Sequence, residues 1–148
     1  KMIEESIKRL EYLCSTIPDL LYKMDDKLFS EKPIPEKWSK KEILGHLIDS
    51  ATNNHQRFVR GQFEEIPTII YDQNNWNKYN FYQQIDKNQV IEFWEIYNKQ
   101  LLELIKRIPS ENLWKECKTN EINNYTIEFL IIDYVEHLEY HLKQIVNY

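Results

Sequence analysis

Residues 39–61 read SKKEILGHLIDSATNNHQRFVRG and carry the clearest helix signals of the chain. Ser39 and Glu42 have the spacing of a capping box, in which the serine satisfies an amide of the first turn while the glutamate reaches back to the cap. Gly61 follows the last turn and is a typical C-terminal stop. The stretch therefore predicts a helix that begins at Ser39 and ends at about Arg60.

Three further blocks have apolar residues at helical spacing. They span residues 2 to about 15, 88–107 and about 126–146. Pro18 is expected to interrupt the first helix, because an internal proline removes a backbone hydrogen bond and clashes with the preceding turn. Four helices around one core predict an all-α four-helix bundle, with residues 1–148 forming a single domain.

Two connections between these helices differ in character. Residues 32–35 contain two prolines and form a linker, because each proline disfavours helical geometry in the residue before it. Residues 62–87 form a longer connection that is rich in aromatic and polar side chains. A connection of this length is usually functional, is disordered or carries short helices, and the aromatic content argues against disorder.

The composition excludes several classes of protein. The 148 residues include only two glycines, which opposes a β-sandwich or barrel with many tight turns and excludes glycine-rich phosphate loops. A total of 19 basic and 24 acidic residues gives a net charge of −5. That balance opposes nucleic-acid binding, which needs a basic face to displace counterions.

The sequence also predicts where the protein works. No apolar run reaches the roughly 18 residues that span a bilayer, and the first residues lack the apolar segment of a signal peptide. Cys14 and Cys117 form neither a CxxC motif nor a disulfide framework, which suits a reducing compartment. We therefore expect a cytoplasmic protein with no membrane or nucleic-acid partner.

A pair of histidines gives the first indication of chemistry. His137 and His141 are four residues apart, so they project from one helical face and can bind a single transition metal. The motif His-Leu-Glu-Tyr-His lacks the glutamate base of the HExxH zinc proteases. Because such pairs also arise from ordinary packing, the spacing alone leaves both interpretations open.

His46 strengthens the metal interpretation. A polar strip of His46, Ser50, Asn53 and Arg57 borders the apolar face of the helix at 39–60, which suits a pocket wall as well as a hydrogen-bonded edge. His55 lies on the opposite side of the same helix and is excluded. Three histidines from two facing helices would leave positions open for water or substrate, as in catalytic metal sites.

In this order, the motifs resemble the DinB-like superfamily, particularly its bacillithiol S-transferases and metal-dependent hydrolases. No single motif is specific, but order and spacing agree from about residue 5 to the last residue. The matching segments are Lys37-Trp38-Ser39, Gly45-His46-Leu47-Ile48-Asp49-Ser50, Asn53, Arg57-Phe58, Pro67-Thr68-Ile69-Ile70-Tyr71-Asp72, Trp76, His137, His141 and Gln144-Ile145.

The resemblance implies an up-down four-helix bundle in which His46, His137 and His141 bind one divalent metal, zinc or nickel. It also implies a small-molecule substrate and an enzyme that either transfers a low-molecular-weight thiol or hydrolyses an amide or ester. Related proteins often have more histidine or tryptophan around the HxxxH segment, where Glu136 and Tyr140 stand here. Neither difference removes a ligand.

Several neighbours of the histidines are candidate site residues. Asn53 and Arg57 are candidates to hold an anionic group, and the aromatic side chains of Tyr71 and Trp76 either cover the pocket or simply pack. The candidates to orient the ligands are Asp49, which flanks the polar strip, Asp133, one turn before His137, and Tyr134, on the same stripe as the histidines. For Asp133, a solvated surface charge is an equal alternative.

Two further expectations concern the alternative function and assembly. A non-catalytic metal-binding module of a stress response is the alternative, because the HxxxH motif contains no obvious general base. A homodimer is expected through an exposed aromatic patch of Trp76, Phe81, Tyr82 and Phe93. Gly45, inside a helix and directly before His46, predicts either a close helix approach beside the site or a tolerated defect.

Overall fold

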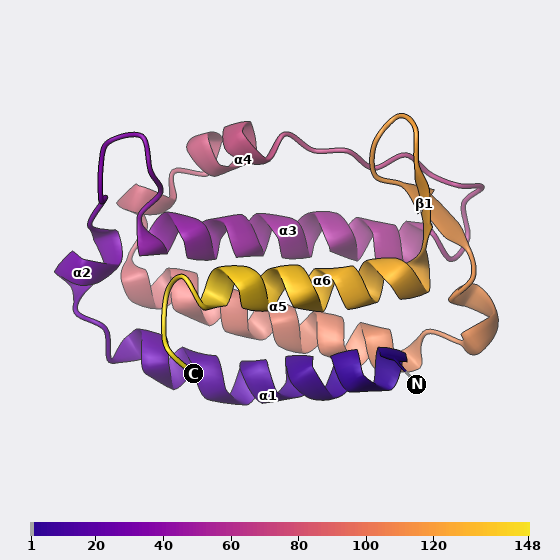
Figure 1. Ribbon diagram of the computed structural model, residues 1–148, viewed down its shortest axis with the longest axis horizontal. Helices are drawn as coiled ribbons and strands as arrows, with labels where there is room; N and C mark the ends of the chain where they lie inside the picture. Colours follow the sequence, from indigo (N-terminus) through magenta and orange to yellow (C-terminus); the bar gives the residue numbers. More distant parts are fainter. Residues whose placement is uncertain (1) are drawn as a thin grey trace.

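Helices α1 (Met2–Tyr22), α3 (Lys40–Arg60), α5 (Lys87–Arg107) and α6 (Ile127–Leu142) lie side by side in the computed structural model, which describes residues 2–148 (Figure 1). Their apolar stripes meet in one core with Trp94 fully buried among leucine and isoleucine side chains. The predicted all-α four-helix bundle is therefore confirmed. Within the described residues, no helix is both long enough and apolar enough to cross a membrane.

The up-down order that the family resemblance implies holds for the first and last helix pairs of the bundle but not for the middle pair (Figure 1). Helices α1 and α3 run in opposite directions, as do α5 and α6, whereas α3 and α5 run in the same direction (Figure 1). The ammonium of Lys41, at the start of α3, donates to the carbonyl of Ile85 just before α5, which places the two starts together. Residues 63–86, which we call the crossover segment, return along the outside of the bundle.

Helix α1 corrects the expectation that Pro18 interrupts it. The helix continues through Pro18 to Tyr22. An internal proline costs about 3 kcal/mol, but Ile17 and Leu21 on either side of it are fully buried. Burying two such side chains contributes about 3–6 kcal/mol, so tertiary packing outweighs the local cost.

The ends of α3 and α6 follow from local signals. The amide of Glu42 donates to the Ser39 hydroxyl at 3.1 Å, and the Ser39 amide donates to the Glu42 carboxylate at 3.0 Å, so the predicted capping box is present. The amide of Gly61 donates to the carbonyl of Arg57 at the other end. Helix α6 ends at Leu142, earlier than the predicted 146, and turns follow it.

A short hairpin was not anticipated. Strands β1 (Glu116–Lys118) and β2 (Asn124–Thr126) pair antiparallel without any glycine in their connection. The Asn120 side chain accepts from the amides of Ile122 and Asn123 and so shapes the turn that glycine often provides. The remaining elements are α2 (Asp26–Ser30), α4 (Gln73–Tyr79) and two 3-10 turns, η1 (Tyr82–Gln84) and η2 (Ser110–Asn112).

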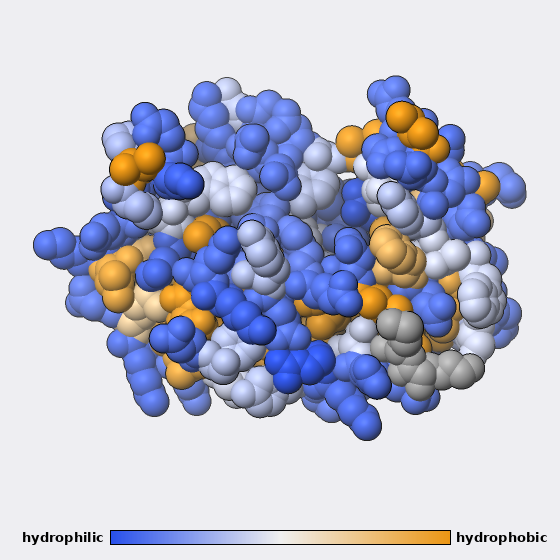
Figure 2. All heavy atoms as spheres, in the orientation of Figure 1, coloured by the Kyte–Doolittle hydropathy of each residue, from blue (hydrophilic) through white to orange (hydrophobic). Residues whose placement is uncertain are grey.

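The crossover segment carries α4 and η1 and is held against α3 by polar contacts. The side-chain amide of Asn77 donates to the carbonyl of Glu42 at 2.8 Å. The Arg57 guanidinium donates twice to the carbonyl of Ile69. These contacts order a connection that has few buried apolar side chains of its own. On the face shown in Figure 2, hydrophobic atoms are scattered among hydrophilic ones, as on many folded domains.

Candidate metal centre

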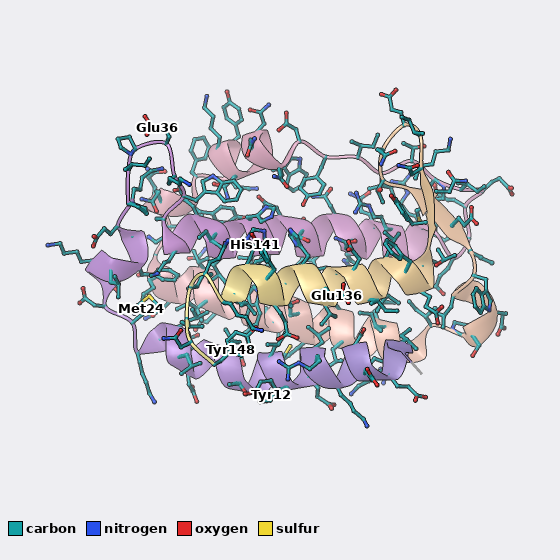
Figure 3. All side chains as sticks on the ribbon, viewed as in Figure 1. Tyr12, Met24, Glu36, Glu136, His141 and Tyr148 are labelled. Atoms are coloured by element: carbon teal, nitrogen blue, oxygen red, sulfur yellow. The ribbon has the colours of Figure 1, made fainter. Side chains whose placement is uncertain are left out.

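Three histidines meet between α3 and α6. The Nε2 atoms of His46 and His137 are 3.4 Å apart, and the ring centroid of His141 lies 4.9 Å from that of His46 and 4.6 Å from that of His137. Because α3 and α6 run in opposite directions, the first turns of α3 face the last turns of α6. Figure 3 shows His141 where these two helices adjoin.

The spacing of the three imidazoles fits a metal ion. One nitrogen from each ring can be chosen so that all three lie within 4.8 Å of one another. Two nitrogens bound to one zinc ion at tetrahedral geometry stand about 3.3–3.4 Å apart, which matches the 3.4 Å between the Nε2 atoms of His46 and His137. Among residues 2–148, no other group of three or more His, Cys, Asp or Glu side chains lies close enough to hold an ion.

Burial favours the neutral form of two of the three imidazoles. His46 is 1% exposed, and burial, followed by the nearby charges that His137 and His141 would carry, lowers its pKa to about 4. Burial also lowers the pKa of His137, which the Asp133 carboxylate partly offsets. Neutral imidazoles present the lone pairs that metal ions require.

Two of the histidines are oriented by neighbours that sequence analysis did not assign. The Nδ1 of His141 lies 2.9 Å from the Gln144 side-chain oxygen, so that nitrogen carries the proton and the Nε2 lone pair stays available. The Trp38 ring lies 5.0 Å from the His46 ring between centroids. The contact with Gln144 could have been predicted from the sequence, because Gln144 lies one turn after His141 and residues at that spacing on a helix are neighbours.

His46 retains an unpaired polar atom. Its Nδ1 is buried without a hydrogen-bond partner in the described structure. Buried polar atoms are nearly always paired. Because Nδ1 has no partner among residues 2–148, the ring of His46 is positioned by its packing against Trp38 and by the partner of its Nε2. A metal ion shared with His137 and His141 would fix which ring nitrogen of His46 carries the proton.

Asp49 lies one turn after His46 and beneath the crossover segment. One carboxylate oxygen, Oδ1, accepts from the Tyr82 hydroxyl at 2.6 Å and from the side-chain amide of Asn80 at 3.0 Å. Burial raises the pKa of Asp49 to about 6, although both hydrogen bonds favour the charged form. The sequence indicates Asp49 as a candidate but not its two donors, which are more than thirty residues away along the chain.

The two candidate anion-binding residues are engaged with the protein itself. Asn53 donates to the carbonyl of Asp49 within α3. The Arg57 guanidinium, which is buried, donates to the carbonyl of Ile69 at 2.8 and 3.2 Å and to the Asn54 side chain. Arg57 thus anchors the crossover segment with donors that an anion would otherwise use.

The aromatic candidates of the crossover segment lie together. The Tyr71 ring contacts the Trp76 ring at a centroid distance of 5.8 Å. Tyr71 also interacts with the side chain of Ser50 and carries a pKa that burial raises. Because Ser50 is one turn after His46, this ring pair lies over the polar strip of α3.

The candidates on α6 face in different directions. Asp133 is exposed, and its charge acts on His137. The Tyr134 hydroxyl donates to the Asn98 side chain at 2.5 Å inside the core, so this residue braces α6 against α5. His55, which the sequence excluded, lies away from the cluster with its Nδ1 2.8 Å from the Tyr97 hydroxyl.

The proposed dimer patch is altered by one residue. Tyr82 is only 6% exposed because its ring lies against α3, so it does not belong to a surface patch. The side chains of Trp76, Phe81 and Phe93 are exposed to solvent. The homodimer stays a prediction.

The shifted pKa of His46 predicts how the metal-free protein responds to pH. Between about pH 4 and pH 6.5 the unfolded chain binds a proton at this position that the native state does not, so the free energy of unfolding rises with pH. Asp49 opposes this trend, since its native carboxyl holds a proton up to about pH 6. Urea unfolding across this range should show a shallower rise, or a fall, in His46→Leu. Equal slopes for both proteins would contradict the assignment.

Comparison with known sequences agrees with this architecture. A family model described as DinB superfamily matches residues 3–145. The protein named "Putative metal-dependent hydrolase OB0413" from Oceanobacillus iheyensis is 24% identical over 149 residues, which cover 97% of this chain and 83% of that protein.

Solved structures share the fold. YfiT from Bacillus subtilis, described as a probable metal-dependent hydrolase with an unusual four-helix bundle topology, gives a TM-score of 0.86 at 20% identity and covers 97% of this chain and 83% of its own. A mycothiol-dependent maleylpyruvate isomerase gives a TM-score of 0.79 at 13% identity, over 97% of this chain but 60% of that one.

Proposed function

Because the chain belongs to the DinB superfamily, we propose that it is an enzyme that binds one divalent transition metal, zinc or nickel, through His46, His137 and His141. The proposal rests on the three imidazoles, which offer nitrogens within 4.8 Å of one another. Three protein ligands leave coordination positions open, which is typical of catalytic rather than structural sites. The relative named as a metal-dependent hydrolase supports the same activity.

Hydrolysis of a small amide or ester is the reaction we favour. A metal ion held at this site supplies a nucleophile at neutral pH, because it lowers the pKa of bound water toward about 7. The chain's own contribution is to present three imidazoles in fixed orientations. Gln144 holds the tautomer of His141, and Trp38 packs on His46 and limits the access of bulk water.

Transfer of a low-molecular-weight thiol is the second candidate. It is favoured by the shared fold of the mycothiol-dependent isomerase and uses the same three histidines, because metal ions also deprotonate thiols. In both reactions we assign Tyr71 and Trp76 to covering the substrate. Asn53 and Arg57 border the same strip and shape it from within α3.

Metal binding should stabilise the folded protein. At a free zinc or nickel concentration 100 times the dissociation constant, the gain is about 2.7 kcal/mol, or an increase in melting temperature of about 5–10 °C. Thermal unfolding with and without a chelator measures it. Magnesium is the control, because it prefers oxygen ligands and should leave the melting temperature unchanged. No shift with either transition metal would contradict the site.

Turnover then separates the two reactions. Zinc-loaded and chelated protein should be compared for hydrolysis of p-nitrophenyl acetate and for conjugation of free cysteine to monochlorobimane. Ester hydrolysis that the chelator removes supports the hydrolase, and thiol conjugation that it removes supports the transferase. Metal binding without either activity would favour a non-catalytic module.

A further inference from the structure

Asp49 is a buried carboxyl that has no cationic partner among residues 2–148. It is 1% exposed, and no basic side chain of the described structure contributes to the shift of its pKa. Carboxylates are rarely buried unless an opposite charge or several donors compensate for the lost hydration. Burying the Asp49 carboxyl therefore costs folding free energy, and packing of the core gives no reason for a carboxyl at this position.

The two oxygens of this carboxyl are treated differently. Oδ1 accepts from the Tyr82 hydroxyl and the Asn80 amide, both supplied by the crossover segment. Oδ2 is buried and has no hydrogen-bond partner in the described structure. An orphan oxygen on a buried acid accommodates either a proton or a hydrogen-bonded ligand. The two bonds to Oδ1 fix the plane of the carboxyl and so leave Oδ2 in a defined place.

The placement of Asp49 relates this oxygen to the histidines. Residues three apart on a helix have Cβ atoms about 5–6 Å apart, so Asp49 and His46 occupy neighbouring positions on α3. Ser50 follows directly and interacts with Tyr71, which brings the covering ring pair to the same turn. His46 and Asp49 therefore lie one turn apart on the same side of α3, which is the placement that a proton acceptor for a group bound at His46 requires.

We propose that Asp49 is the proton acceptor for the nucleophile that the three-histidine site activates. The inference rests on the proposed function. The O–H bond of water, or the S–H bond of a thiol, breaks with its electron pair left on the nucleophile, and the proton passes to Oδ2 of Asp49. The proton then goes to the departing atom of the substrate, which restores the carboxylate. This supplies the base that the HxxxH motif lacks.

The acidity of Asp49 suits this role. A base is most effective when its pKa lies near the working pH, and burial raises the pKa of this carboxyl to about 6. The groups that face it are Tyr82 and Asn80, whose hydrogen bonds lower its pKa, and Tyr71. At pH 7 the carboxyl is ionised and able to accept a proton.

An anchoring role is the competing explanation, because Asp49 also ties the crossover segment to α3. Two substitutions separate the roles. Asp49→Asn keeps the shape and accepts the same two hydrogen bonds through its carbonyl oxygen, but it cannot accept the proton. Tyr82→Phe removes one anchoring bond and retains the carboxylate.

Kinetics of the zinc-loaded proteins form the first test. Asp49→Asn should retain stoichiometric zinc and lower kcat by about 10²–10⁴-fold, the usual contribution of a general base. Tyr82→Phe should keep kcat within about tenfold and move the acidic limb of the pH profile to higher pH, because the lost hydrogen bond favoured the carboxylate. A kcat of Asp49→Asn within about threefold of wild type would overturn the proposal. Loss of zinc from this variant would overturn it as well.

A carboxyl titration tests the inference without turnover. Carbon-13 NMR of the metal-free wild type should show one aspartate that titrates near pH 6, is missing in Asp49→Asn and moves upward in Tyr82→Phe. Titration of Asp49 near the ordinary value of 3.8 would overturn the inference whatever the activity. Absence of turnover in the zinc-loaded wild type, in contrast, contradicts the proposed function itself.

Discussion

Replacing His137 by alanine is expected to abolish tight binding of zinc or nickel while leaving the helix content and most of the stability unchanged. His137 faces His46 with 3.4 Å between their Nε2 atoms, so its loss removes one of three donors. The affinity should fall by more than the roughly 10–100-fold that removal of an outer partner causes. Isothermal titration calorimetry measures the affinity, and circular dichroism measures the helix content.

The matched control is His55→Ala. His55 also lies on a long helix and contacts an aromatic ring, that of Tyr97, but it stands outside the cluster. Its loss should leave the affinity for zinc unchanged. Wild-type affinity in His137→Ala would show that the ligands are misassigned, and an equal loss in His55→Ala would show that binding reflects histidine content rather than this site.

Gly45→Ala is expected to destabilise the protein by about 3 kcal/mol, although alanine favours helices by about 1 kcal/mol over glycine. A Cβ at this position would lie 2.2–2.6 Å from three atoms of the Tyr82 ring. That ring is buried and tied to Asp49 through its hydroxyl, so relief requires overpacking strain of about 1–3 kcal/mol and the loss of a hydrogen bond to a charged group, about 1.5–3 kcal/mol. Urea unfolding measures the change.

A double-mutant cycle isolates the cause. In a Tyr82→Ala background the added methyl group meets no ring, so Gly45→Ala should be neutral or stabilising by up to about 1 kcal/mol. An equal loss of stability with and without the Tyr82 ring would contradict the contact. The close approach that Gly45 allows is therefore to a side chain of η1 rather than to a neighbouring helix.

Local sequence signals predicted an element correctly where the interactions that stabilise it join residues within one or two helical turns. The Ser39–Glu42 capping box set the start of α3, because its two hydrogen bonds join residues three apart. Helical spacing placed His137 and His141 on one face for the same reason. In contrast, the helix break predicted at Pro18 was wrong, because the buried side chains around it gain stabilisation from packing against other helices.

The candidate site shows the same division. The sequence identified the three histidines as a set through order and spacing, and the bundle brings them within 4.8 Å. It did not reveal that Arg57 is used to hold Ile69, or that Tyr134 bonds Asn98 in the core. Those partners come from segments whose sequence distance carries no periodic signal.

The sequence by itself determined the four long helices, the bundle and the common face of His137 and His141, because periodicity and caps depend on neighbours within one or two turns. Only the tertiary structure decided that α3 and α5 run in the same direction and that the crossover segment returns along α3 (Figure 1). It also decided the surroundings of Asp49. Hydrogen bonds from Tyr82 and Asn80 exist only once the chain has returned along α3, so no local pattern encodes them.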